Sequence, residues 1–273
     1  MKILDGRDLA DYVKERQAAQ VRALRQAWHV IPKLAIVQTI DDPVIDTYVR
    51  LKRTYGEDIL VEVEVHKVAQ AELLSTIDRL NKDELVHGII IQLPLEDGDQ
   101  TDEAVNAVSP LKDVDGLGES PAFTPATAMA IDWLLAGYNV ELRDATIAIV
   151  GKGRLVGAPL AKLWGTTGYN VTTYDSSTEN FATALRGASV VVTATGVPGL
   201  INSQMIQPGA TVVDAGTAAE HGKIVGDLNA DVRAREDLTI TPEKGGVGPL
   251  TVTALFDNVI QAARAVADAQ KDS

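Results

Sequence analysis

The sequence predicts an α/β fold of two domains, each built on a parallel sheet covered by helices. Apolar strand-like runs alternate with amphipathic helical segments along the chain, a pattern typical of parallel sheets. The apolar run Ile147–Val150 leads through a glycine-rich turn into a helical segment, Leu155–Trp164, which is the order strand, turn, helix. A length of 273 residues suits two domains of about 100–200 residues each.

The first domain, residues 1–118, is expected to alternate helix and strand three times. The expected helices are Asp8–His29, Pro43–Tyr55 and Ala69–Leu80, and the expected strands are Lys33–Gln38, Val61–Val65 and His87–Leu93. The second helix has the clearest start, because Asp42 can cap it and Pro43 suits its first position.

The second domain, residues 119–250, is expected to be a Rossmann-like, doubly wound sheet. Its expected strands are Ile147–Val150, Asn170–Asp175, Ser189–Thr193, Ala210–Asp214 and Leu238–Ile240. An amphipathic helix, Thr251–Ala267, closes the chain.

Composition excludes several classes of protein. A net charge of −13 disfavours nucleic-acid binding, and the absence of cysteine excludes disulfides and thiolate sites. We predict no metal site, because the histidines lack ligand spacing; they are His29, His66, His87 and His221. Early acidic residues and the lack of an apolar run of about 20 residues indicate a cytoplasmic protein without membrane contact.

The glycine-rich turn predicts a dinucleotide site. Gly151, Gly153 and Gly157 let the backbone approach a pyrophosphate, and the following helix start offers N–H groups to it. The spacing is Gly-x-Gly-x-x-x-Gly, with Val156 where the commonest fingerprint has glycine, so an ordinary strand-to-helix turn is the alternative. Lys152 and Arg154 lie in the same turn.

The choice of cofactor depends on Asp175, which ends the next strand. A carboxylate there usually accepts hydrogen bonds from the adenosine ribose and repels a 2′-phosphate, which favours NAD. Alternatively, Asp175 caps the turn formed by Ser176 and its neighbours. Lys152 and Arg154 favour NADP instead, because either can pair with a 2′-phosphate. The balance favours NAD slightly, with NADP left open.

Two further glycine turns follow predicted strands, Ala194–Gly199 and Gly245–Thr251. Strands of a parallel sheet end at a common edge, where open α/β domains bind ligands. We therefore expect Thr195 and Gly196, together with Ser176, to contact the cofactor.

Four motifs occur in an order that one known family shares: Tyr48–Lys52, His87–Leu95, Lys112–Gly116 and Gly245–Thr251. Over nearly its whole length the chain resembles the bifunctional methylenetetrahydrofolate dehydrogenase/methenyltetrahydrofolate cyclohydrolase family. The resemblance implies a folate cleft between the two domains, a C-terminal helix (residues 251–273) that packs back on the first domain, and a homodimer formed through the nucleotide domains.

The resemblance also implies residue roles. Lys52 is the catalytic group, Gln92 is its hydrogen-bond partner, and Tyr48 packs along the folate. Asp115 binds the amino-pyrimidine edge of the pterin, for which Asp113 is the competing candidate, although turn structure is its expected role.

Gly246 and Pro249 are expected to contact the substrate, also by resemblance. The chain departs from the family pattern at several positions. Lys152, Asp175 and Ser177 replace residues that hold a 2′-phosphate, Gly153 replaces a serine, and Ile45 replaces a serine near the folate cleft.

The implied reaction is oxidation of 5,10-methylenetetrahydrofolate by NAD or NADP, followed by hydrolysis to 10-formyltetrahydrofolate. Three alternatives are a folate dehydrogenase without the hydrolase, a dehydrogenase of the shikimate or amino-acid type, and a non-catalytic folate- or nucleotide-binding protein. The retained Tyr48, Lys52, Gln92 and Asp115 favour the bifunctional enzyme.

Overall fold

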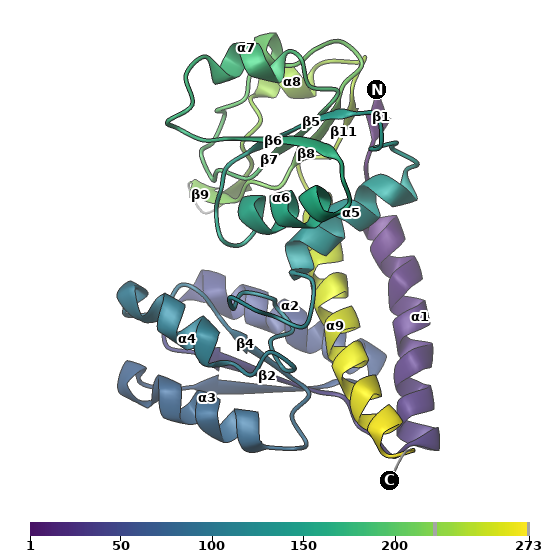
Figure 1. The fold of residues 1–273 in the computed structure, drawn as a ribbon, viewed down its shortest axis with the longest axis vertical. Coiled ribbons are helices and arrows are strands. Elements are labelled where there is room, and N and C mark those ends of the chain that lie inside the picture. Colours follow the sequence, from purple (N-terminus) through teal and green to yellow (C-terminus); the bar gives the residue numbers. More distant parts are fainter. Residues whose placement is uncertain (221–222, 272–273) are drawn as a thin grey trace. The chain divides into compact units, whose positions relative to one another are not determined.

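The computed structural model describes residues 1–220 and 223–271, which form two compact units (Figure 1). The six-stranded unit comprises Met1–Ala10 and Thr127–Thr251, and the three-stranded unit comprises Asp11–Ala126 and the chain from Val252 onward. Each has parallel strands in its main sheet and helices around it. The predicted α/β class is therefore confirmed.

These units differ from the expected domain bounds at the N-terminus. Strand β1 (Lys2–Ile3), which the sequence did not predict, pairs with β11 (Thr239–Ile240), and the amide of Gly6 donates to the carbonyl of Gly245 at 2.8 Å. The first ten residues therefore belong with the nucleotide-type sheet. Two long helices, α1 (Gly6–Ala27) and α9 (Val247–Ala269), contribute residues to both units.

The three-stranded unit has the strand order β3-β2-β4. Its strands are β2 (Lys33–Gln38), β3 (Glu62–Lys67) and β4 (Gly88–Ile91), close to the predicted ranges. Its other helices are α2 (Pro43–Ile59), the 3-10 turn η1 (Gln70–Glu72), α3 (Leu73–Lys82), η2 (Gly98–Gln100) and α4 (Thr101–Ala107). Helices α3 and α4 pack together against β4 (Figure 1), where Ile77, Ile89 and Val105 are buried in one cluster.

Helix α2 carries part of the predicted site, and its start agrees with the sequence. The Asp42 side chain accepts hydrogen bonds from the amides of Val44 and Ile45, and Pro43 occupies the first turn. The helix continues to Ile59, past the predicted end near Tyr55, because Gly56 packs closely against β3 instead of ending the helix.

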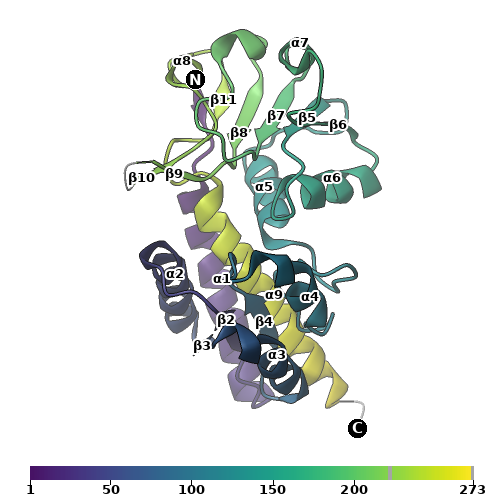
Figure 2. The ribbon, with the colours of Figure 1, turned by 90° about the vertical axis from the view of Figure 1, so that its left-hand side faces the viewer.

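The six-stranded unit has the order β1-β11-β8-β7-β5-β6 (Figure 2). Its predicted strands are present as β5 (Thr146–Val150), β6 (Asn170–Tyr174), β7 (Val190–Thr193), β8 (Thr211–Asp214) and β11. The helical segments are α5 (Ala126–Gly137), α6 (Gly157–Thr166), α7 (Phe181–Leu185), η3 (Ser203–Met205) and α8 (Ala230–Arg233), and β9 (Ala218–Glu220) pairs with β10 (Lys223–Val225).

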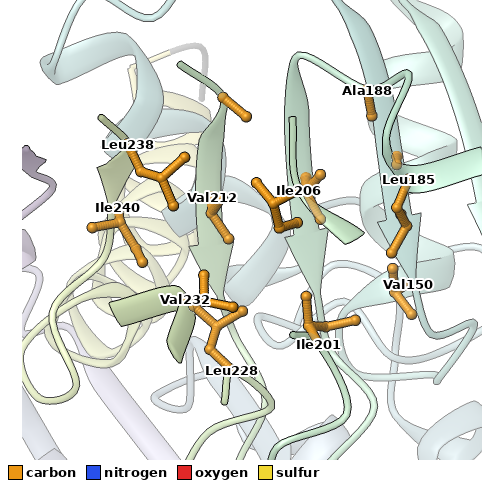
Figure 3. Close-up of a cluster of buried hydrophobic side chains, with 13 residues drawn as sticks. Val150, Leu185, Ala188, Ile201, Ile206, Val212, Leu228, Val232, Leu238 and Ile240 are labelled. Atoms are coloured by element: carbon orange, nitrogen blue, oxygen red, sulfur yellow. The ribbon is translucent and has the colours of Figure 1, made fainter. Parts of the chain in front are cut away.

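One face of this sheet is covered by an apolar cluster that joins strands to the short helices (Figure 3). Val150, Val212 and Ile240 from the strands meet Leu185 from α7 and Val232 from α8. These side chains are almost fully buried. Val150 is the last residue of β5, so its packing holds the strand end at which the Gly151 turn begins. Within the described part of the chain, no helix is long and apolar enough to cross a bilayer.

Candidate active site

Lys52 and Gln92 meet in the three-stranded unit although 40 residues separate them. The Lys52 ammonium (Nζ) donates to the Gln92 side-chain oxygen (Oε1) at 2.9 Å. Gln92 directly follows β4, and its amide donates to the carbonyl of Val37 in β2 at 2.8 Å. Its side-chain nitrogen donates to the carbonyl of Leu93, which turns the oxygen toward Lys52.

Tyr48 lies four residues before Lys52 on α2, so both side chains project from one face of the helix. The tyrosine is 36% exposed, which leaves ring surface available for a flat ligand. Ile45, by contrast, is 6% exposed and packs in the core of this unit. The Ile45 side chain therefore serves the fold.

Asp115 is the acidic neighbour of Lys52. Burial lowers the pKa of Lys52, and the charge of Asp115 partly opposes that change. Burial likewise raises the pKa of Asp115 to about 6, against the attraction of the Lys52 charge. The two groups thus have pKa values shifted toward each other, an arrangement suited to proton transfer and to holding a polar ligand.

Asp113 structures the loop that presents Asp115. Its two side-chain oxygens accept hydrogen bonds from the amides of Gly116, Leu117 and Gly118 at 2.8–3.3 Å. Asp113 is 5% exposed, so its carboxylate is occupied inside the turn. The expectation that Asp113 shapes the turn is confirmed.

The predicted phosphate turn is sterically demanding at two of its glycines. Gly151 has φ +105°, and a Cβ there would overlap the Ala194 carbonyl; a Cβ at Gly157 would overlap the Gly151 carbonyl. Gly153 is different, because a Cβ at that position would meet nothing within 4 Å.

This turn fits a dinucleotide pyrophosphate. Helix α6 begins at Gly157 without a side-chain cap, so the charge of its N-terminus is not satisfied by a capping side chain. The open space at Gly153 gives a phosphate access to the backbone. These two observations match the requirements of the cofactor that the turn predicts.

Lys152 and Asp175, which were expected to favour opposite cofactors, bind each other. Lys152 Nζ lies 2.6 Å from Asp175 Oδ2, and the hydroxyl of Ser177 donates to Asp175 Oδ1 at 2.5 Å. The Lys152 ammonium and the Ser177 donors hold the pKa of Asp175 well below its usual range. Asp175 also accepts from the Ser177 amide, so the turn-capping alternative describes its geometry, while Ser176 is exposed beside it.

Thr195 and Gly196 lie in the loop after β7, next to the phosphate turn, as the contact between Gly151 and Ala194 requires. The amides of Thr195 and Val197 both donate to the buried carboxylate of Asp227. Since two of the amides in this turn are thereby used, it offers a phosphate fewer donors than its glycines suggested. Asp227 was not predicted from the sequence, where it is only an acidic residue that follows Gly226 in a loop.

Gly246 and Pro249, the remaining expected substrate contacts, lie in the six-stranded unit. Gly246 directly precedes α9 and approaches Thr241, while Pro249 lies in the first turn of that helix. Lys52 and Asp115 belong to the three-stranded unit, so the expected folate contacts are divided between the two units.

The family models decide the identity of this arrangement. The catalytic domain of tetrahydrofolate dehydrogenase/cyclohydrolase matches residues 4–115, and the NAD(P)-binding domain of the same family matches residues 125–267. The chain belongs to the tetrahydrofolate dehydrogenase/cyclohydrolase family. The resemblance inferred from four sequence motifs is thus confirmed.

Individual members of this family agree over nearly their whole length. The bifunctional protein FolD of Bordetella petrii is 38% identical over 280 residues, covering 97% of this chain and 95% of that protein. The solved bifunctional FolD of Campylobacter jejuni has a TM-score of 0.91 at 32% identity, with 97% and 99% covered. The FolD of Trypanosoma brucei, solved with NADP and an inhibitor, has a TM-score of 0.89 at 31% identity, with 97% of each chain covered.

The family assignment supports a nicotinamide cofactor and a folate substrate. In residues 1–220 and 223–271 we find no group of three His, Asp or Glu side chains arranged to hold a metal ion. His87 is a structural residue, because its Nδ1 accepts from the amide of Lys33 and burial lowers its pKa to about 4. His221 lies outside the described residues.

Proposed function

We propose that this chain oxidises 5,10-methylenetetrahydrofolate with a nicotinamide dinucleotide and then hydrolyses the methenyl product to 10-formyltetrahydrofolate. The observation that carries the proposal is the Lys52–Gln92 hydrogen bond beside Asp115 in the domain that matches the catalytic model. Family membership and 38% identity to a bifunctional relative over nearly the whole chain support both activities.

In the oxidation, the bound dinucleotide supplies the hydride acceptor. Gly151, Gly153 and Gly157 would hold its pyrophosphate at the start of α6, with Thr195 and Gly196 beside them. Tyr48 would pack along the folate, and Asp115 would accept hydrogen bonds from the amino-pyrimidine edge. Gly246 and Pro249 are proposed as further folate contacts. The task of all these residues is to orient two flat rings.

In the hydrolysis, Lys52 in its neutral form takes a proton from water. The water oxygen bonds to the methenyl carbon, which gives a hydroxyl adduct. The hydroxyl then loses its proton as the formyl C=O forms, the bond from that carbon to N5 breaks, and N5 takes one of the two water protons while the other is released to solvent. Burial lowers the pKa of Lys52, which makes the neutral amine more accessible near neutral pH. Gln92 orients the amine through its side-chain oxygen.

The decisive experiment measures both reactions on the purified protein. Absorbance of the methenyl product follows oxidation of methylenetetrahydrofolate with NAD⁺ and NADP⁺ in parallel, and its decay follows hydrolysis without a dinucleotide. We expect both activities. Oxidation without hydrolysis would indicate a dehydrogenase-only member, and activity on shikimate or an amino acid instead would overturn the proposal.

We further propose that NAD⁺ is used better than NADP⁺. Lys152 forms an ion pair with Asp175, so its charge is not available to a 2′-phosphate. Asp175 remains a hydrogen-bond acceptor for the adenosine ribose hydroxyls, one of which NADP⁺ replaces with a phosphate. The Trypanosoma brucei relative was solved with NADP, so this preference would distinguish the present chain from that protein.

Asp175→Asn tests this preference. Losing the carboxylate frees Lys152 to pair with the 2′-phosphate, so kcat/KM for NADP⁺ should rise by about ten-fold relative to NAD⁺. Asp268→Asn, an exposed aspartate paired with Lys271 on α9, is the matched control and should leave the ratio unchanged. A wild-type enzyme that strongly prefers NADP⁺ would show that Lys152 or Arg154 outweighs Asp175.

We also infer, from the family resemblance, a homodimer formed through the nucleotide domain. Light scattering on the purified protein tests this inference, and a monomer at micromolar concentration would contradict it.

A further inference from the structure

A fully buried carboxylate, that of Asp227, lies beneath the loop after β7. Its Oδ2 accepts from the hydroxyl of Thr193 at 2.6 Å and from the amide of Thr195 at 2.7 Å. Its Oδ1 accepts from the amide of Val197 at 3.1 Å. Asp227 is 0% exposed, its bond from Thr193 is buried and the two amide bonds are partly buried, so losing one of these bonds is costly.

The backbone of Asp227 is held by hydrogen bonds to its neighbours. The Asp227 amide donates to Asp214 Oδ1 at 3.0 Å, and the Asp227 carbonyl accepts from the amide of Ile201. Asp214 in turn binds the Arg233 guanidinium at 2.6 Å. A Cβ at Gly216 would overlap the Asp227 carboxyl group, so this side chain is packed closely from that side.

The loop that Asp227 holds borders the cofactor turn. Gly151 approaches the Ala194 carbonyl so closely that it tolerates no side chain, and Ala194 is followed at once by Thr195. Val197, two residues later, is 49% exposed. Asp227 thus holds the loop from within by two amides, while the outer side of the loop faces solvent at the carboxyl edge of β5 and β7.

We propose that Asp227 is a positioning residue for the dinucleotide, because it sets the Thr195–Val197 loop against the Gly151 turn. It acts through that loop and does not touch the cofactor. The inference rests on the proposed dehydrogenase function. It does not involve Lys52, Gln92 or Asp115, so the hydrolase reaction should not depend on it.

Asp227→Asn is the principal test, because it preserves volume but places an amide NH₂ against N–H donors. The dissociation constant of NADH or NADPH, measured by the fluorescence of the reduced nucleotide, should rise by about ten-fold, as expected for one lost hydrogen-bonded interaction. The KM for NAD⁺ should rise similarly, with the KM for methylenetetrahydrofolate unchanged. Hydrolysis of methenyltetrahydrofolate without a dinucleotide should stay within about two-fold of wild type.

Asp231→Asn is the matched control. Asp231 also holds a loop, through the amide and hydroxyl of Ser203, but on the exposed side of η3. It should leave nucleotide binding unchanged. Thr193→Val, which removes one donor to Asp227 at nearly constant volume, should weaken nucleotide binding in the same direction but less.

The outcomes separate the two proposals. Normal nucleotide binding by a folded Asp227→Asn or Thr193→Val variant would overturn the positioning role. Parallel loss of binding and hydrolysis in Thr193→Val would also overturn it, because a general structural role would then suffice. A wild-type protein that binds the nucleotide but oxidises no methylenetetrahydrofolate would refute the proposed function and leave the positioning role standing.

Discussion

The pKa and the orientation of the Lys52 amine depend on residues that are remote in sequence. An exposed lysine stays charged near neutral pH, but burial in this unit lowers the pKa of Lys52. Gln92, 40 residues later, accepts from its ammonium, and the charge of Asp115 limits the shift. A neutral amide partner orients the amine without adding the charge stabilisation that a second carboxylate would bring.

Lys52→Met should abolish most of the hydrolase activity. We expect the rate of methenyltetrahydrofolate hydrolysis to fall by at least about 100-fold, because methionine retains the apolar length but cannot accept a proton. Lys82→Met, at an exposed position on α3, is the control. Undiminished hydrolysis by the Lys52 variant would disprove the assignment.

Asp115→Asn should shift the pH dependence of hydrolysis. The negative charge of Asp115 raises the pKa of Lys52 against the effect of burial, so its removal lowers that pKa further. Neutral lysine then forms at lower pH. The midpoint of the acid limb in kcat should therefore move to lower pH, while the overall rate falls because a proposed folate contact is lost.

The control for the shift in the pH midpoint is Asp58→Asn. Asp58 lies on α2, the helix that carries Lys52, and its exposed side chain pairs with Lys14. A midpoint that stays in place or moves to higher pH in Asp115→Asn would show that the neutral amine of Lys52 is not the acting base.

At the scale of elements, local sequence signals located most helices and strands. The Asp42–Pro43 start of α2 was predicted because its capping bonds lie within three residues, and β2 was predicted at its observed bounds. The end of α2 was placed too early, since the packing of Gly56 against β3 depends on a strand outside the window. Strand β1 was missed, because two residues carry no periodicity and only pairing with β11 defines them.

Gly157, where the turn before α6 meets that helix, has no room for a side chain, and this can be tested. Gly157→Ala should weaken binding of NADH by at least about ten-fold, because its Cβ would overlap the Gly151 carbonyl and displace the turn. Gly165→Ala, later on α6 and outside the turn, where a Cβ also meets nothing within 4 Å, is the matched control and should bind NADH normally. Equal nucleotide binding by both variants, measured by fluorescence titration, would contradict this account of the turn.

At the level of the whole chain, the residues proposed for the two reactions belong to different compact units. The unit with Lys52, Gln92 and Asp115 carries the proposed hydrolase groups, and the six-stranded unit carries the nucleotide turn. Variants of the nucleotide turn should therefore spare the hydrolase measured without a dinucleotide. Helices α1 and α9 contribute residues to both units.

The sequence alone determined the α/β class, most elements, the glycine turn and the family, since these depend on short windows and on motifs in order along the chain. Three features became visible only in the folded chain: Met1–Ala10 joins the six-stranded unit, Lys152 pairs with Asp175, and Asp227 accepts hydrogen bonds from the Thr195–Val197 loop. The physical reason is that such pairings join segments brought together by sheet order and burial. No local propensity encodes which buried carboxylate meets which backbone amide.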